Sequence, residues 1–482
     1  MKRKNILLLM SDQQRLDTVS AYGLNRICRT PHIDRLAGEG MKFCQAFTAS
    51  AICSPSRAGV MTGLYPHHHG VIDNDTDLKP GVPLLSEHLK AAGYYCGYAG
   101  KWHISMAKTP GDCGFAGKAF MGYGFPGSGV FPGLRFNAPP EGENDYQRYL
   151  TEHGFEIPHI SGSFMGDNPN LQVQEMYARH DGPVESTIEY YVAREAIGQI
   201  EQAAQGQEPF FIWANFWGPH SPSIVPEPYY SMYHPGDIPE YPGYRDDLSD
   251  KPYGHRLCER MWGLGSFGWP GMAEITARYY GHCTMIDDMV GMIVKRLEEL
   301  GMLEDTVIVY TADHGDCLGA HKLIEKGPFM YDETYRVPLV VYGLGRHDND
   351  SLVYLHELMP SFLELAGIRE AVKQPLDGES LLPLMNGEQK DNGREAVYGQ
   401  FHNHFFISRH RLIRTREYAF VFNENEAGEL YDLAQDPYEL VNQNNNPEYQ
   451  EIKNELKQQL LEHLEAVDDP ARHWYKRIYL YY

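Results

Sequence analysis

The segment Cys53-Ser54-Pro55-Ser56-Arg57 places a thiol, two hydroxyls and a guanidinium within five residues. Ser54 suits the N-cap of a helix, and Pro55 suits the first helical position, where no backbone N–H is needed. Cys53 would then lie at a helix N-terminus, whose free amides favour an anion, and Arg57 would add a fixed cation. Because a single cysteine is more often a small buried hydrophobic residue, a site here requires further polar groups nearby.

Four apolar runs of the sequence are each followed by residues that can bind a metal or move a proton. The runs and the residues that follow them are NILLLM with Asp12 and Gln13, YYCGYAG with Lys101 and His103, PFFIWANF with His220, and TVIVYTA with Asp313 and His314. Since ligands bind beyond the carboxyl ends of parallel strands, we expect these side chains to converge at one edge of a sheet.

The residues Asp12, Gln13, Asp313 and His314 form a plausible metal-binding set. Their mainly hard oxygen ligands favour Ca²⁺ or Mg²⁺, whereas the imidazole is also compatible with Mn²⁺ or Zn²⁺. Either aspartate alone could equally be a helix N-cap after a strand, but their occurrence at two strand ends favours a metal. With the anion site at Cys53, this pattern predicts metal-assisted hydrolysis of a tetrahedral anionic ester and leaves phosphate and sulfate both open.

The elements that must position these residues indicate an α/β protein. The four runs, together with VPLVVYG at 337–343, are apolar throughout, as in strands buried on both faces of a mostly parallel sheet. Residues 271–301 read as a long helix with Gly301 as its C-cap. We expect a catalytic α/β domain over residues 1–385. We expect a smaller C-terminal α+β subdomain over 386–482, with two or three antiparallel strands at 395–423 and a closing helix at 447–467.

Charge and composition exclude several classes of protein. The chain of 482 residues carries a formal net charge of −23, which disfavours binding to nucleic acid or to an anionic membrane surface. No apolar run reaches the roughly 18 residues that a membrane helix needs, and the run at 6–10 is too short for a signal peptide. The sequence therefore predicts a cytoplasmic protein with no membrane or nucleic-acid partner.

Cys53-Ser54-Pro55-Ser56-Arg57, with Thr62-Gly63, resembles the signature CxPxR…TG of the formylglycine-dependent (type I) sulfatases of the alkaline phosphatase superfamily. Further blocks resemble this family in the same order along nearly the whole chain. They are NILLLMSDQQRLDTVSAYG, TPHIDRLAGEGMKF, GLYPHHHGV, AGKWH, ADHGD, the segment Lys326…Tyr331-Asp332-Glu333, and ELYDLAQDPYELVN. The resemblance implies an alkaline-phosphatase-like fold with a large, mostly parallel sheet flanked by helices and a smaller C-terminal antiparallel sheet plus helix.

The resemblance also implies a mechanism. Cys53 would be oxidised to Cα-formylglycine by a maturing enzyme and hydrated to a gem-diol, of which one oxygen binds the metal and attacks sulfur. The second hydroxyl would let the aldehyde re-form and expel sulfate. By the same resemblance, Arg57 and Lys101 would hold the diol, and His103 would act as the base. His220 and Lys326 would bind sulfate, and His220 would also protonate the leaving alcohol.

Two positions depart from the commonest family pattern. Gln13 stands where many sulfatases have a second acid, and His314 stands where many have asparagine. Both choices occur in the branch that includes choline sulfatases and phosphonate monoester hydrolases, which makes calcium less certain and widens the range of substrates. In this branch an amide at the position of Asn74 often faces the anionic group, so we expect Asn74 to bind substrate. The aromatic-rich FMGYGFPGSGVFPG and the segment HNHFF at 402–406 are further candidates for the pocket.

The sequence and its resemblance thus predict a sulfatase acting on a sulfate monoester of a carbohydrate, with a small-molecule or oligosaccharide sulfate as substrate. One alternative is a phosphonate or phosphate ester hydrolase that uses the same diol and metal. A second is a catalytically inactive, metal-stabilised binding protein in which Cys53 stays a thiol. The retention of Asp12, Arg57, Lys101 and the other predicted site residues argues against this second alternative.

Overall fold

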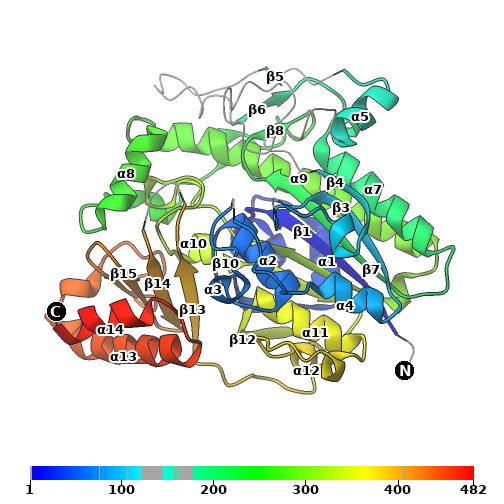
Figure 1. Ribbon diagram of the computed structural model, residues 1–482. Coiled ribbons are helices and arrows are strands. Elements are labelled where there is room, and N and C mark those ends of the chain that lie inside the picture. The colour runs from blue at the N-terminus through cyan, green and yellow to red at the C-terminus, as the bar shows by residue number, and fades with distance from the viewer. Residues whose placement is uncertain are drawn as a thin grey trace.

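The computed structural model describes residues 3–74, 76–105, 107–120, 145–156, 160–161, 177–404 and 408–481. Within these residues its centre is a nine-stranded sheet, visible between layers of helices in Figure 1. In spatial order its strands are β10 (Arg336–Val337), β2 (Met41–Phe47), β11 (Leu339–Tyr342), β9 (Thr306–Ala312), β1 (Asn5–Asp12), β7 (Phe210–Pro219), β3 (Tyr95–Lys101) and β4 (Ala116–Phe120), with β12 (Asp348–Tyr354) paired to β2.

The centre of this sheet is parallel. β1 pairs in parallel with β7 and β9, β3 pairs in parallel with β7 and β4, and β12 pairs in parallel with β2. The strand predicted at 337–343 is β11, and it runs antiparallel to both β9 and β2. The chain between β9 and β11 contains the short helix α10 (Asp332–Tyr335) but no crossover helix, so β11 starts near the edge where β9 ends and returns in the opposite direction. The predicted mostly parallel α/β class is confirmed.

Helices cover both faces of the sheet, which explains the continuous apolar runs. Alternate residues of β1 belong to two different cores: Ile6 and Leu8 pack with one set of helices, and Leu7 and Leu9 pack with another. The first set contains α2 (Cys53–Thr62), α4 (Leu85–Ala91), α11 (Leu358–Leu365) and α12 (Leu382–Met385), and the second contains α1 (Pro31–Glu39), α7 (Ile188–Ala203) and α9 (Gly268–Glu299). A strand buried on both faces has no position for a solvated side chain.

The long helix predicted at 271–301 is α9; its C-cap is Leu300, and Gly301, the predicted C-cap, lies one residue beyond. Gly301 has a left-handed backbone with φ 68°, and its N–H donates to the carbonyl of Glu298 at 2.9 Å. A residue with a side chain would be strained in this conformation, so glycine is favoured just beyond the helix.

A second, four-stranded antiparallel sheet follows along the chain. Its order is β13 (Ala396–Phe401), β14 (His410–Thr415), β15 (Tyr418–Asn423) and β16 (Glu429–Asp432), and it is followed by α13 (Gln450–Ala466) and α14 (Arg472–Tyr481). Figure 1 shows these two helices beside the small sheet, where Leu460 and Tyr475 pack with Phe420. The predicted antiparallel C-terminal sheet and closing helix are confirmed, whereas the division at residue 385 stays a prediction.

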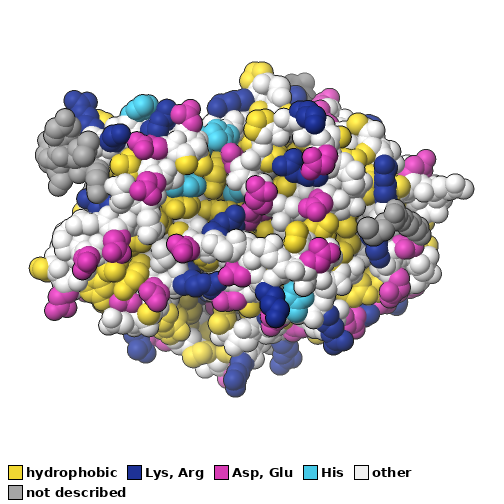
Figure 2. All heavy atoms as spheres, turned by 90° about the horizontal axis from the view of Figure 1, so that it is seen from below, with side chains coloured by type: hydrophobic (Ala, Val, Ile, Leu, Met, Phe, Trp, Pro, Cys, Tyr) yellow, Lys and Arg dark blue, Asp and Glu magenta, His cyan; other side chains and the backbone are white. Residues whose placement is uncertain are grey.

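Smaller elements lie in the segments that connect these strands and helices. These are α3 (Pro66–His69), α5 (Asp145–Glu152), α8 (Tyr253–Trp262) and a three-stranded sheet of β5 (Ile160–Ser161), β6 (Tyr177–His180) and β8 (Ser223–Val225). Most of the aromatic-rich segment FMGYGFPGSGVFPG lies outside the described residues. Acidic and basic side chains are interspersed over the face shown in Figure 2 rather than gathered by sign. Among the described residues, no helix is both long enough and apolar enough to cross a membrane.

Candidate active site

Cys53 is the first residue of α2, as the sequence predicts, but the helix is capped differently. The N-cap is Ile52, Ser54 lies in the first turn, and Pro55 is the third helical residue, so the predicted roles of Ser54 and Pro55 are wrong. The carboxamide oxygen of Asn74 accepts the Ser54 N–H at 3.1 Å, and the Ser54 hydroxyl donates to the Asn74 carbonyl at 3.0 Å. Because a residue 20 positions away satisfies a free amide of the helix, the local sequence alone does not reveal it.

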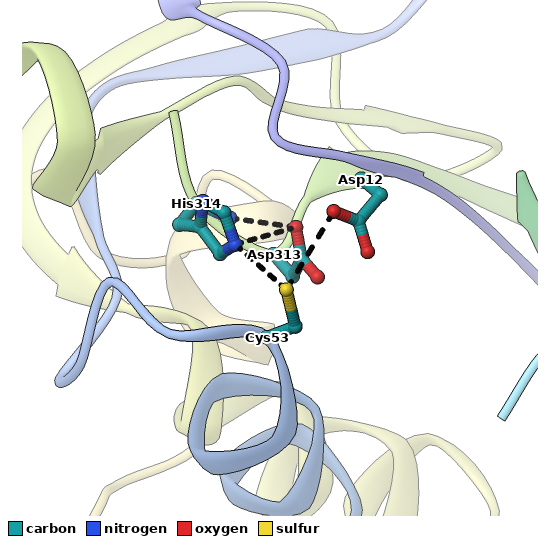
Figure 3. A group of neighbouring side chains, drawn as sticks. All are labelled: Asp12, Cys53, Asp313 and His314. Carbon is teal, nitrogen blue, oxygen red and sulfur yellow. Dashed lines mark hydrogen bonds and ion pairs between the residues drawn. The ribbon is translucent and has the colours of Figure 1, made fainter. Parts of the chain in front are cut away.

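Four side chains converge beside the N-terminus of α2, as Figure 3 shows. Asp12 ends β1, Asp313 and His314 directly follow β9, and these three join Cys53 with their ligand atoms all within 4.8 Å of one another. The Cys53 Sγ lies 3.2 Å from His314 Nε2 and 3.7 Å from Asp12 Oδ1. All four side chains are buried, so water competes little for their ligand atoms.

A hydrogen bond at Nδ1 of His314 orients the ring so that Nε2 faces this cluster. Its Nδ1 lies 2.8 Å from the carbonyl oxygen of Gly315, to which only an N–H can donate. The lone pair therefore belongs to Nε2, which faces Cys53. Burial lowers the pKa of His314 and keeps the ring neutral, the form that ligates metals.

Two buried cations neutralise the carboxylates of the cluster. Arg57 donates to Asp12 Oδ2 and to Asp313 Oδ2, both at 2.8 Å, and Lys101 Nζ lies 2.6 Å from Asp12 Oδ2. Burial alone would raise the pKa of Asp12, but the charges of Lys101 and Arg57 outweigh burial and hold that pKa well below its usual value. Asp12 is therefore an ionised acceptor at any ordinary pH.

Gln13 reaches the same edge, and its side chain is held by Lys326 and Asp316. Its backbone is left-handed, with φ 62°, and its amide oxygen accepts from Lys326 Nζ at 2.7 Å. Its amide nitrogen donates to a carboxylate oxygen of Asp316. The metal-binding role of Gln13 stays a prediction, and in this structure its side chain links Lys326 to Asp316.

Lys326 and His220 form the second half of the candidate site. His220 follows β7, and its Nε2 lies 2.6 Å from Lys326 Nζ and 3.9 Å from Asp12 Oδ1. Its Nδ1 lies 2.5 Å from the carbonyl oxygen of Ser221, so Nδ1 carries a proton and Nε2 accepts one from the lysine. Lys326 thereby approaches the cluster from a loop that the sequence alone does not place.

His103 lies two residues beyond the end of β3, in a left-handed conformation with φ 50°. Burial and the neighbouring charge of Lys101 lower the pKa of His103 well below its usual value. A neutral imidazole can accept a proton, so the electrostatics are compatible with a base. Of the segment 402–406, His404 lies near Asp73, with 3.4 Å between His404 Nδ1 and Asp73 Oδ1, while residues 405 and 406 are outside the described residues.

Several residues that support the site were not predicted from the sequence. Asn215 of β7 accepts from Arg57 at 2.8 Å, Asp316 accepts from Gln13, and Glu325 lies 3.0 Å from Lys326 Nζ. The only signals in the sequence are the second acid of the ADHGD block and the acid adjacent to Lys326. Neither reveals a hydrogen-bond partner.

Comparison with known proteins identifies the family. The family model described as Sulfatase matches residues 4–368, which is most of the chain. The chain belongs to the sulfatase family. This confirms the resemblance seen in the sequence and supports a sulfuric ester hydrolase. A second model, described as N-sulphoglucosamine sulphohydrolase, C-terminal, matches residues 319–466.

Relatives and solved structures of this sulfatase cover nearly all of it. It is 29% identical to an uncharacterized sulfatase of Escherichia coli (strain K12), over 98% of this chain and 89% of the relative. It is 26% identical to the N-acetylglucosamine-6-O-sulfatase of Bacteroides thetaiotaomicron, over 96% of this chain and 86% of the relative. The structure of the phosphonate monoester hydrolase of Agrobacterium radiobacter superposes with a TM-score of 0.79, at 24% identity and 96% coverage of both chains. The predicted alkaline-phosphatase-like fold is confirmed.

Proposed function

We propose that this sulfatase hydrolyses a sulfate monoester of a carbohydrate, with formylglycine made from Cys53 as nucleophile and a divalent metal beside it. The observation that carries the proposal is the convergence of Cys53 with Asp12, Asp313 and His314 at a helix N-terminus. A carbohydrate substrate is supported by the N-acetylglucosamine-6-O-sulfatase among the relatives. The reaction consumes one water and converts the ester to an alcohol and sulfate.

The donor set fits a divalent cation. Asp12 and Asp313 would supply carboxylate oxygens, and the neutral Nε2 of His314 already faces the same point. Mainly hard oxygen donors favour Ca²⁺, with Mg²⁺ or Mn²⁺ as alternatives. A bound cation there would supply positive charge to the sulfate oxygens, and hydrated formylglycine would supply the attacking hydroxyl and the second hydroxyl that expels sulfate.

The side chains of this chain would supply the remaining charge and proton transfers. Arg57 and Lys101 hold the carboxylates in place and add fixed positive charge, each worth roughly 3 kcal/mol in comparable sites. His103, neutral because of burial and Lys101, would take the proton that leaves as the aldehyde re-forms. Lys326 Nζ donates to His220 Nε2, so His220 would first take up a proton at Nε2, from Lys326 or from solvent, and would then pass it to the leaving alcohol.

The test begins with the mass of the peptide that contains residue 53, from protein produced together with a formylglycine-generating enzyme. We expect the mass to show an aldehyde in place of the thiol, and sulfate to be released from sulfated monosaccharides or disaccharides. The Cys53→Ala variant should release none. An unchanged thiol, under conditions that convert another sulfatase, would favour the inactive binding protein.

Phosphonate or phosphate ester hydrolysis is the second candidate function. Gln13 and His314 follow the pattern of the branch that contains phosphonate monoester hydrolases. Parallel assays on aryl sulfate, aryl phosphonate and aryl phosphate esters decide between the candidates, because the ratio of kcat/KM values reports differential binding of the transition states. A higher value for phosphonate than for any sulfate ester would overturn the sulfatase proposal. The predicted cytoplasmic location is tested separately by fractionating the producing cells.

A further inference from the structure

Glu325 is a buried carboxylate beside the candidate site, with 4% of its surface exposed. Its Oε2 lies 3.0 Å from Lys326 Nζ, and its Oε1 accepts the hydroxyl of Ser221. Its own N–H donates to Asp316 Oδ1 at 2.9 Å, and its backbone is left-handed, with φ 67°. Three contacts therefore fix both the backbone and the carboxylate of Glu325.

These contacts join two separate segments of the site. Ser221 follows His220 beyond β7, whereas Lys326 belongs to the loop after β9, about a hundred residues later. The carboxylate of Glu325 bridges a side chain from each segment. Because Lys326 Nζ also lies 2.6 Å from His220 Nε2, this bridge holds the lysine against the imidazole that would protonate the leaving group.

Glu325 also changes the charge of the site. Burial alone would raise the pKa of Glu325, but Lys326 and His220 outweigh burial and hold that pKa at about 2, so the group carries a full negative charge. The charged side chains around the candidate site are the cations Arg57, Lys101 and Lys326 and the carboxylates Asp12, Asp313, Asp316 and Glu325, and burial raises the pKa of Asp316 only to about 6. Without Glu325, the remaining carboxylates would only equal the cations in number, so a divalent metal would leave the site with a larger excess of positive charge.

We propose that Glu325 is a positioning residue that fixes Lys326 against His220, and that its negative charge makes the site prefer monoanionic esters over dianionic ones. This inference rests on the proposed function of the site. A sulfate monoester and a phosphonate monoester each carry one negative charge, whereas a phosphate monoester carries two above its second pKa, near 6. In a buried site a carboxylate repels the second charge strongly, because water screens it little.

The experiment compares 4-nitrophenyl sulfate, 4-nitrophenyl phenylphosphonate and 4-nitrophenyl phosphate at about pH 8, with metal-loaded, formylglycine-containing enzyme. The main variant is Glu325→Gln, which keeps the shape and an acceptor oxygen but removes the charge. We expect kcat/KM for the phosphate monoester, relative to the phosphonate monoester, to rise about tenfold or more. The ratio of the two monoanionic substrates should stay within about twofold, since their charges are equal.

Two matched variants separate charge from geometry. Ser221→Ala removes one contact of Glu325 but keeps the charge, so it should lower kcat for all three substrates and leave their ratios unchanged. Glu325→Asp keeps the charge but shortens the side chain, and it should behave in the same way. Glu325→Met provides a second neutral variant if the glutamine variant does not fold, as judged by circular dichroism and thermal unfolding.

The proposal is overturned if the neutral variants keep the wild-type ratio of phosphate to phosphonate hydrolysis, or if Glu325→Asp changes that ratio as much as Glu325→Gln does. This result is distinguishable from failure of the proposed function. If the wild type hydrolyses phosphonate but no sulfate ester, the sulfatase proposal fails, while the ratio of dianionic to monoanionic substrate still tests Glu325.

Discussion

Replacing His356 with leucine should make the protein less sensitive to acid. His356 lies in the short 3-10 turn Leu355–Glu357, with 2% of its surface exposed. Its ring packs against Tyr354 and Tyr65, with centroid distances of 4.7 and 4.9 Å. Burial disfavours the imidazolium more than Glu357 and Asp377 favour it, so the pKa of His356 falls to about 4. Leucine is similar in volume and does not titrate.

The size of the effect follows from the two pKa values. The unfolded chain binds the proton with a pKa of 6.5 and the folded protein with one of about 4. The contribution of neutral His356 to stability is therefore complete above pH 6.5 and is lost as the pH falls from 6.5 toward 4. A pH of about 5 lies roughly 1.5 units below 6.5. At about 1.4 kcal/mol per unit, the free energy of unfolding lost there is roughly 2 kcal/mol.

The assay is urea unfolding at about pH 7.5 and pH 5, followed by circular dichroism, in the presence of a chelator so that metal binding does not contribute. The wild type should lose roughly 2 kcal/mol more than His356→Leu does between the two pH values. Phe362→Leu is the matched control, because Phe362 is a buried residue of α11 that does not titrate. The free energy of unfolding that Phe362→Leu removes should be equal at both pH values. An equal loss in the wild type and His356→Leu would refute the reasoning.

Further predictions concern the active site and the C-terminal sheet. Lys101→Met should lower kcat on an aryl sulfate about 10²- to 10³-fold, measured with fully converted enzyme, because it removes a fixed cation beside Asp12. Adding Ca²⁺ at about 100 times its Kd should stabilise the wild type by about 2.7 kcal/mol, and Asp313→Asn should abolish most of the rise in Tm. Arg411→Met leaves the buried Asp469 without its bidentate partner and should cost about 3–5 kcal/mol at neutral pH. In the wild type, burial opposes ionisation of Asp469, but Arg411 holds its pKa at about 2. In Arg411→Met the unpaired carboxyl takes up a proton as the pH falls toward 4, so the loss of unfolding free energy caused by the substitution should shrink.

The parts of the fold that were predicted correctly are those with a strong local signal. β1, β7 and β9 are buried at every position and largely apolar, because each is covered on both faces. β2 has mixed buried and partly exposed positions, and β4 has only five residues, so neither gives a clear pattern, and both were missed. The direction of β11 was also not predictable, since it depends on the edge of the sheet at which the preceding loop ends.

The same limit applies to the site. Asp12, Asp313 and His314 were found because residues at the carboxyl ends of parallel strands meet at one edge of the sheet. The orientation of Gln13 toward Lys326, and the bond from Ser54 to Asn74, depend on partners distant in the sequence. A propensity read from neighbouring residues contains no information about such partners.

The sequence by itself determined the residue types of the site, the strands that carry them and the family to which the chain belongs. These features depend on local patterns and on the order of motifs along the chain. Only the tertiary structure decided which atoms meet, such as Lys326 with His220 and Glu325 with Ser221. The physical reason is that hydrogen bonds between buried groups require positions accurate to a few tenths of an ångström, and packing of the whole chain sets those positions.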